Sequence, residues 1–277
     1  MEEQAVPFVQ VDAFTHGLFQ GNPAVVILLQ PPAFHRQGAS KWMQKVAQEK
    51  NLNATAFVAP RERPEGDIAY NIKWFSPLVE FTMCGHGTFI GRCCSTGLRS
   101  GASYPNDSLL QSRFRVVLNF PVKPIRKLPP GTSREVVAAA LRVSTTGVLD
   151  VQLALNDVIV RVDKETFLTL KPDFHRLAEI DTGVAVTTEA PSDRGDFQSR
   201  FFAPRIGINE DFVTASAHCG LGPYWSAILG KKKLVGYQST PTRGGSIEIH
   251  LDEEHPDRVQ LKCEGVVVAR GMLTALN

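Results

Sequence analysis

Two segments of the sequence place a histidine among small residues just before an apolar stretch. The first is Cys84–Thr88 (CGHGT), and the second is Thr214–Gly220 (TASAHCG). The apolar stretch after each segment predicts a helix, and the first turn of a helix presents unpaired N–H groups and partial positive charge. Such an N-terminus binds carboxylates and phosphates. The two segments therefore predict a binding site for a small anionic molecule.

Polar side chains in and beside these segments are candidates for acid–base chemistry. If both helix starts face one cleft, we expect His86, Asp211 and Ser216 to act as catalytic acid, base and hydrogen-bond groups. The residues expected to bind the substrate are Gly85, Gly87, Thr88, Ala217 and His218. A structural alternative stays open, in which Asp211 and Ser216 cap turns and His218 packs in the core.

The five cysteines are Cys84, Cys93, Cys94, Cys219 and Cys263, and they form neither a CxxC pair nor a metal-binding spacing. An odd, irregular set is typical of reduced thiols in a cytosolic protein, so we expect a cytoplasmic protein without a metal site. Cys84, before the first predicted helix, is either a thiolate of lowered pKa or a small buried hydrophobe.

The composition excludes several classes of protein. With 43% hydrophobic and 21% charged residues, the chain has enough apolar residues for a sizeable core. A net charge of +2 with scattered basic residues argues against nucleic-acid binding. No window holds the roughly 18 apolar residues of a membrane helix, and the N-terminus has acids where a signal peptide needs basic residues. The glycosylation motif at Asn53 is therefore predicted to be silent.

β-branched and aromatic composition predicts a β-rich chain with few helices. Apolar residues at helical spacing predict a helix over residues 40–50, with Ser40 as its candidate N-cap. A second helix, small and apolar nearly all round, is expected over residues 88–98. Strands are expected over residues 6–14, 24–29, 55–59, 68–75, 114–120, 148–155, 158–162, 183–188 and 197–203, and further helices over 135–142, 174–178 and from 214 to 228.

The second half of the chain repeats the pattern of the first. Trp74–Pro77 (WFSP) precedes the first histidine segment, and Phe201–Pro204 (FFAP) precedes the second. A proline-rich stretch over residues 121–130 (PVKPIRKLPP) predicts a linker between the halves. We therefore expect two similar domains, residues 1–122 and 123–277, each a β-layer around a buried helix, with the last strand free to pack on the first half.

Several motifs in order resemble the PhzF family of phenazine biosynthesis-like proteins. They are DAFT…GNPAVVILL (residues 12–29), NLNATAFV (51–58), WFSPLVEFTMCGHGT (74–88), SRFFAPRIGINEDFVTASAHCGLGPYW (199–225), RGGSI (243–247) and the closing GMLTAL (271–276). The resemblance runs nearly end to end. It implies an α+β, diaminopimelate-epimerase-like fold: two pseudo-symmetric domains, each with a β-sheet wrapped around a central helix, and an active site in the cleft.

The resemblance also implies a cofactor-free enzyme, usually a homodimer, that acts on a small carboxylated metabolite. The family reaction is isomerisation of trans-2,3-dihydro-3-hydroxyanthranilate by proton transfer between ring carbons, with a carboxylic acid as the proton shuttle. The family's CGH histidine matches His86, and its EDPVTGSAH block matches residues 210–218, so its site aspartate and serine match Asp211 and Ser216. Within that block Phe212 replaces a proline and Ala215 replaces a glycine.

The largest departure from the family pattern lies in the NLNAT stretch. The family has NLSE-T, with the glutamate as general acid and base, and Ala54 stands at that position. Because alanine neither gives nor takes a proton, the resemblance alone leaves three readings open. The first is an isomerase with a displaced acid (Glu80, Asp211 or His86) or with altered chemistry. The second is a degenerate member that binds a metabolite or an unidentified protein partner, and the third is an otherwise active member with an engineered or atypical Ala54.

Two-thiol epimerases related to the family are a further alternative. They need a cysteine at each helix start; Cys84 matches the first, but Thr214 stands at the second.

Overall fold

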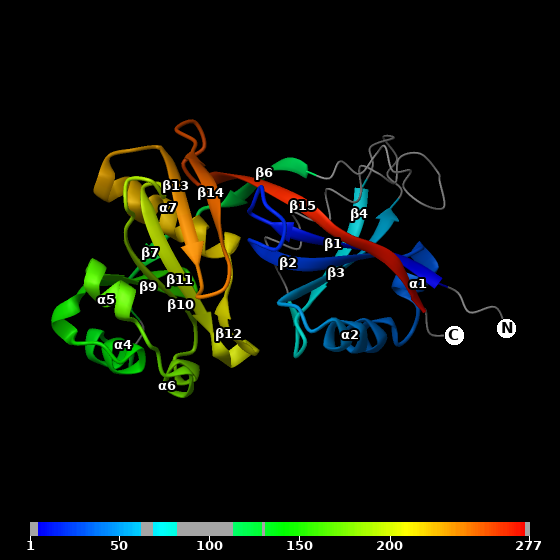
Figure 1. Cartoon of the computed structure of the whole chain (residues 1–277), viewed down its shortest axis with the longest axis horizontal. Coiled ribbons are helices and arrows are strands. Elements are labelled where there is room, and N and C mark those ends of the chain that lie inside the picture. Colours follow the sequence, from blue (N-terminus) through cyan, green and yellow to red (C-terminus); the bar gives the residue numbers. More distant parts are fainter. Residues whose placement is uncertain (1–4, 62–68, 82–112, 129–130, 275–277) are drawn as a thin grey trace. The chain divides into compact units, whose positions relative to one another are not determined.

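The computed structural model describes residues 5–61, 69–81, 113–128 and 131–274. They belong to two compact units, one of residues 1–116 with 264–277 and one of residues 117–263. Figure 1 shows the course of the chain. The helix expected over residues 88–98 lies outside the described residues. None of the described helices is long and apolar enough to span a membrane.

The first unit is built on a sheet with the strand order β5-β4-β3-β2-β1-β15. Its strands are β1 (Ala5–Ala13), β2 (Asn22–Leu28), β3 (Ala54–Arg61), β4 (Ala69–Phe75), β5 (Glu80–Phe81) and the later part of β15 (Arg258–Thr274). Strand β2 runs parallel to β3, while the β1–β2, β3–β4 and β1–β15 pairs are antiparallel. A parallel pair requires a crossover, and α1 (Pro31–His35) with α2 (Ala39–Lys50) supplies it.

Helix α2 forms because apolar residues at helical spacing cover the sheet. Met43 and Ala47 are fully buried against Val25, Ile27 and Phe57, and each large apolar side chain so buried contributes about 1.5–3 kcal/mol. The predicted cap is wrong. The N-cap is Gly38, whose φ is +81°.

Ser40 is instead inside the helix, where its hydroxyl accepts a hydrogen bond of 2.8 Å from Lys73.

The second unit has the strand order β14-β13-β11-β10-β9-β8-β7, with the start of β15 beside β14 and β12 beside β11. Its strands are β7 (Ile125–Arg126), β8 (Val148–Ala154), β9 (Asp157–Val162), β10 (Gly183–Glu189), β11 (Phe197–Ala203), β12 (Ile208–Asp211), β13 (Lys233–Ser239) and β14 (Gly244–Leu251). Strand β6 (Arg113–Pro121) pairs with β15. The helices are α4 (Arg134–Leu141), α5 (Lys164–Thr169), α6 (Phe174–Glu179) and α7 (Ala215–Leu229).

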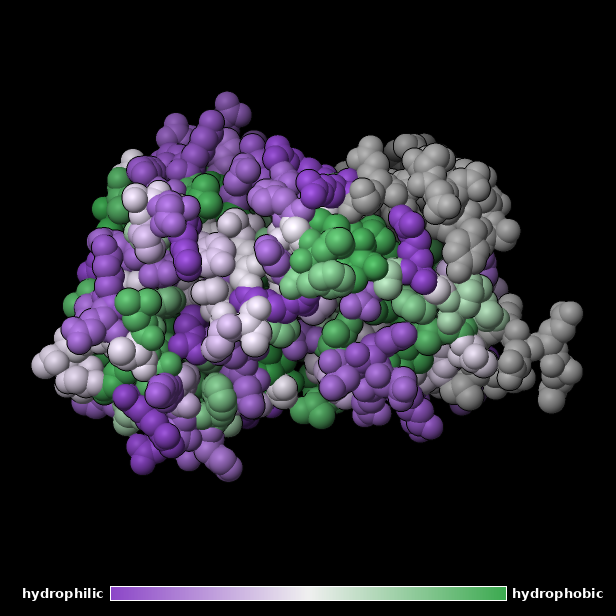
Figure 2. Space-filling view, viewed as in Figure 1, coloured by the Kyte–Doolittle hydropathy of each residue, from purple (hydrophilic) through white to green (hydrophobic). Residues whose placement is uncertain are grey.

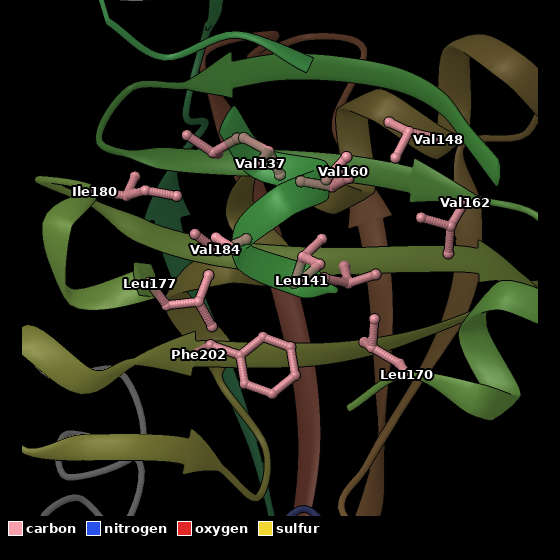
Figure 3. Close-up of a cluster of buried hydrophobic side chains, with 14 of the residues drawn as sticks. Val137, Leu141, Val148, Val160, Val162, Leu170, Leu177, Ile180, Val184 and Phe202 are labelled. Carbon is pink, nitrogen blue, oxygen red and sulfur yellow. The ribbon is translucent and has the colours of Figure 1, made fainter. Parts of the chain in front are cut away.

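The two faces of this sheet have different partners because side chains alternate along a strand. Val158, Val160 and Val162 of β9 face one core with residues of α4, α5 and α6. Figure 3 shows Val160 and Val162 in this cluster with Val137 and Leu141 of α4 and Leu177 of α6. Between Val158 and Val160, Ile159 faces Gly220 of α7. Ten of the fifteen residues of α7 are buried, so α7 is the central helix of the unit.

The proline-rich stretch is not a free linker. Ile125 and Arg126 form β7, which pairs with β8. The buried ammonium group of Lys123 forms an ion pair with the buried carboxylate of Asp157, and its backbone N–H donates to the carbonyl of Cys219 in α7 over 3.0 Å. Hydrogen bonds and charge therefore hold this stretch within the second unit.

Exposed apolar residues occur on both units. In the first unit, Leu18 is 52% and Phe19 is 69% exposed; in the second, Leu168 is 78% exposed. The face drawn in Figure 2 carries many hydrophilic residues and several separate hydrophobic areas. Scattered exposed apolar residues are normal on soluble proteins, and this surface by itself identifies no partner.

Candidate active site

The start of α7 has an uncapped first turn. Strand β12 ends at Asp211, and the N-cap residue Thr214 has an extended backbone with φ −111° and ψ 94°. Its side chain makes no capping hydrogen bond to the helix, although a threonine at this position usually makes one. The N–H groups of the first turn therefore lack the usual side-chain acceptor, and an anion at this end of α7 would be favoured.

The Thr214 hydroxyl does not cap the helix because it donates instead to the carboxylate of Asp211. The distance from Oγ1 to Oδ2 is 2.6 Å. Gln238 of β13 completes the arrangement: its Oε1 accepts from the Thr214 N–H at 2.9 Å, and its Nε2 donates to the carbonyl of Asp211 at 2.9 Å and to Thr214 Oγ1 at 3.0 Å. We call these three residues the Asp211–Thr214–Gln238 chain.

All three members of the chain are buried, with Asp211 7%, Thr214 9% and Gln238 0% exposed. Buried polar groups are costly unless they are hydrogen-bonded, and a satisfied network holds its members rigidly. The carboxylate of Asp211 is therefore fixed beside the first turn of α7. Ser216, in that turn, is half-buried, and Ala217 is 3% exposed.

His218 is fully buried one turn further along α7. Its Nδ1 lies 2.8 Å from the Thr214 carbonyl and must donate, because a carbonyl only accepts. Nε2 has no hydrogen-bond partner among the described residues. A Cβ on Gly236 would lie 2.9 Å from that atom, so the absence of a side chain there lets the strand approach the ring. His218 packs as a core histidine here, and its predicted contact with the substrate stays a prediction.

Burial lowers the pKa of His218 to about 4, although its hydrogen bond to Thr214 acts in the opposite direction. The unfolded chain has a histidine pKa near 6.5. Between these values the unfolded state binds more protons, so the free energy of unfolding should fall by about 3 kcal/mol as the pH falls from about 7 to about 4. Urea unfolding at several pH values measures this slope.

The control for this prediction is His218→Asn, whose side-chain amide can still donate to the Thr214 carbonyl. The variant is expected to lose the part of the slope between about pH 6.5 and pH 4 that belongs to the imidazole. Equal slopes in the unmodified protein and the variant would contradict the buried neutral histidine.

Ala54, at the position of the family's glutamate, is the first residue of β3 and is fully buried. Its register partner is Ala24 of β2. Thr55 follows with a buried Oγ1 that has no partner among the described residues, but successive side chains of a strand point to opposite faces. At position 54, where the family resemblance implies the proton shuttle, the side chain is thus a methyl group.

Glu80 and Asp211, the two carboxylates proposed as displaced acids, lie in different surroundings. Glu80, at the start of β5, is exposed and lies 3.9 Å from the ammonium group of Lys73, which fits a strand-end carboxylate. Asp211 belongs to the buried chain described above.

Gly85, His86, Gly87 and Thr88 lie outside the described residues, as does Cys84. Their predicted roles stay predictions. Cys219 is buried, and burial raises the pKa of its thiol to about 12. It is a packing residue, as its position in an apolar helix indicates. No group of three metal-binding side chains occurs among the residues that the structure describes.

No sequence motif marks Gln238. Thr214 is marked only as the first residue of the second histidine segment and as the position where two-thiol epimerases have a cysteine. The sequence of β13 carries a signal for Gln238. Every second residue of this strand, namely Leu234, Gly236 and Gln238, is buried, so the face that buries Leu234 also buries the amide of Gln238. A polar side chain at a core position of a strand requires a buried partner.

The family model for phenazine biosynthesis-like proteins (PhzC-PhzF) matches residues 11–271. A protein named an uncharacterized isomerase, from Halalkalibacterium halodurans, is 35% identical over 96% of this chain and 98% of its own length. The crystal structure of a PhzF-family protein from Enterococcus faecalis matches with a TM-score of 0.75 and 28% identity, over 98% of this chain and 100% of that one.

A hydroxyproline epimerase from Agrobacterium vitis has the same fold. Its structure matches with a TM-score of 0.55 at 8% identity, over 99% of this chain and 94% of that one. The expected α+β, diaminopimelate-epimerase-like fold is confirmed by these structural matches.

Proposed function

Because the chain belongs to the phenazine biosynthesis-like (PhzC-PhzF) family, we propose that it is an isomerase scaffold that binds a small carboxylated substrate and moves a proton without a cofactor. The observation that carries this proposal is the buried Asp211–Thr214–Gln238 chain beside the uncapped start of α7. A helix start favours a bound carboxylate, and a fixed carboxylate beside it can exchange a proton with that molecule, so the arrangement supports the proposal.

Each residue of this site has a proposed task. The first-turn N–H groups of α7 and the Ser216 hydroxyl hold the substrate carboxylate. Asp211 holds a substrate hydroxyl or amine, or exchanges a proton with the substrate. Gly85, His86, Gly87 and Thr88 lie outside the described residues; the family resemblance implies that they also bind the substrate, and we propose the same role for them.

A second candidate function follows from Ala54. The shuttle position carries a buried methyl group, so the chain lacks the titratable group that the family uses there. Binding through the helix start of α7 does not need that group. The alternative is therefore a protein that binds a carboxylated metabolite, or a protein partner, without turning it over.

Proton exchange separates these two functions. We expect the native protein, incubated with trans-2,3-dihydro-3-hydroxyanthranilate in deuterated water, to bind the compound and to place deuterium at ring carbons slowly. Mass spectrometry measures the deuterium, and calorimetry measures binding. Ser216→Ala is expected to weaken binding by about one hydrogen bond to a charged group, roughly 1.5–3 kcal/mol.

The outcomes of this experiment are distinct. Binding without exchange above buffer supports the binding function and overturns the isomerase. Absence of both binding and exchange overturns the proposed substrate class.

Homodimerisation and a cytoplasmic location are also part of this proposal. They are supported by the family resemblance and by the cysteine usage of the sequence. Among the described cysteines, Cys219 and Cys263 are free and buried. Sedimentation velocity on the purified protein tests the dimer.

A further inference from the structure

Gln238 has a buried side-chain amide, and its partners define which end of the amide accepts and which end donates. Oε1 accepts from a backbone N–H, and Nε2 donates to a backbone carbonyl and to a hydroxyl. Exchanging the two ends of the amide would place a donor against the N–H of Thr214 and an acceptor against the carbonyl of Asp211. The orientation of the amide therefore follows from the backbone groups alone.

The orientation of the amide also sets the direction of the next hydrogen bond. A hydroxyl has one hydrogen. Because Thr214 Oγ1 accepts from Gln238 at 3.0 Å, its own hydrogen is left to point at Oδ2 of Asp211, 2.6 Å away. Each bond of the chain thus has one defined donor, and the chain ends on the carboxylate.

We propose that Gln238 is a positioning residue for ligand binding: through Thr214 it orients the carboxylate of Asp211 and the first turn of α7. It comes from β13, twenty-four residues after Thr214, and touches no substrate itself. The inference rests on the proposed function, in that the ligand is the carboxylated substrate of the same site. It adds a residue that the family motifs in the sequence do not mark.

Gln238→Glu tests the direction of the chain with almost no change of shape. The ionised glutamate keeps an acceptor for the Thr214 N–H but donates to nothing. The Thr214 hydroxyl then has two carboxylates competing for its single hydrogen, and Asp211 loses its fixed donor. When the introduced glutamate is protonated, it donates again and restores the original direction.

The pH window for this test follows from the neighbouring groups. Among the described residues, the titratable groups that hydrogen-bond to Thr214, the direct partner of Gln238, are Asp211 and His218. His218 titrates at about 4, below the window. Burial and the adjacent Asp211 carboxylate are expected to raise the pKa of the introduced glutamate above its usual value near 4.3. Measurements between about pH 5 and pH 8 therefore report mainly on the introduced glutamate.

The experiment measures binding of 2-aminobenzoate, a stable aromatic carboxylate, by calorimetry on the full-length protein at both ends of this window. Gln238→Glu is expected to bind at least about 10-fold more weakly than the unmodified protein at pH 8, the loss of roughly one charge-assisted hydrogen bond. At pH 5 the two affinities are expected to converge. Gln238→Met, which cannot donate at any pH, is expected to stay weak at both.

Gln198→Glu is the matched control. Gln198 lies on the neighbouring strand β11 and is also buried, with 6% of it exposed. It is not a member of the Asp211–Thr214–Gln238 chain. Gln198→Glu is expected to show no recovery of binding at low pH. A purely structural role for Gln238 predicts the same pH dependence for Gln238→Glu and Gln198→Glu, and that outcome overturns the inference.

A ligand-independent measurement keeps this inference separate from the proposed function. The carboxyl carbon of Asp211, followed by NMR, is expected to shift in Gln238→Glu at pH 8, to return at pH 5, and to be unchanged in Gln198→Glu. If the unmodified protein does not bind 2-aminobenzoate, the proposed substrate class fails while this resonance still decides the role of Gln238. An unchanged Asp211 resonance in Gln238→Glu overturns the positioning role of Gln238.

Discussion

Ala54→Glu is expected to raise the rate of deuterium incorporation into trans-2,3-dihydro-3-hydroxyanthranilate by roughly 10²–10⁴-fold, the usual contribution of a general acid–base group. The substitution returns a titratable carboxyl to the position where the family motif has its glutamate. Ala54 is fully buried at the start of β3. Burial raises the pKa of a carboxyl toward neutrality, and a group that titrates near the working pH gives and takes protons most effectively.

The control is Ala54→Gln, which has the same size as glutamate and does not titrate. Both variants add volume at a buried site, so both are expected to lower the free energy of unfolding, by about 1–3 kcal/mol. Only Ala54→Glu should gain activity. A folded Ala54→Glu protein whose exchange rate equals that of Ala54→Gln would show that the shuttle does not act from this position.

Lys123→Met is expected to lower the free energy of unfolding by about 3–5 kcal/mol, the cost of leaving a buried charge without its partner. Lys123 and Asp157 are both buried and form an ion pair beneath α7. Removing the ammonium group leaves the Asp157 carboxylate desolvated and uncompensated. Chemical denaturation followed by tryptophan fluorescence measures the loss, since Trp225 lies fully buried in the same helix.

Two further variants sharpen this prediction. Asp157→Asn in the Lys123→Met background removes the remaining charge at constant shape, so the double variant should regain much of the lost stability, a large non-additivity. Lys231→Met breaks the ion pair between Lys231 and Asp196, in which the lysine side chain is 56% exposed. It is expected to cost about 0–1 kcal/mol. Similar losses in Lys123→Met and Lys231→Met would contradict a role for burial.

Much of the β-structure was predictable because local composition and burial agree. Strand β11 coincides with the expected range 197–203, and α7 covers the helix expected to end at Ile228. Helices α1 and α5, of five and six residues, were not predicted, although α6, also of six residues, was. Strands β13, β14 and β15 were not predicted either. The predicted cap of α2 is wrong because Ser40 has a side chain typical of an N-cap, while the helix follows Gly38, whose positive φ favours glycine.

The sequence marks part of the candidate site: motif spacing marks Asp211 and Ser216, the family resemblance marks Ala54, and neither marks Gln238. Gln238 reaches Thr214 from a strand that follows α7 in the sequence, so its partner is set by tertiary packing and by no local pattern. The composition of residues 121–130 predicts a linker because their contacts, too, are set by tertiary packing. The residue that anchors it, Asp157, is thirty-four positions away, and a long-range ion pair leaves no trace in composition.

Strand β15 has a consequence for the order in which this protein is made. Its residues 265–274 pair with β1 along the whole length of that strand, and β1 leaves the ribosome long before β15 does. One edge of β1 must therefore remain open until β15 has been translated, although domains usually fold as they emerge. An open strand edge is a template for wrong pairing. The first unit thus depends on protection during synthesis, and a nascent chain stalled before residue 265 should be more prone to aggregate than the released protein.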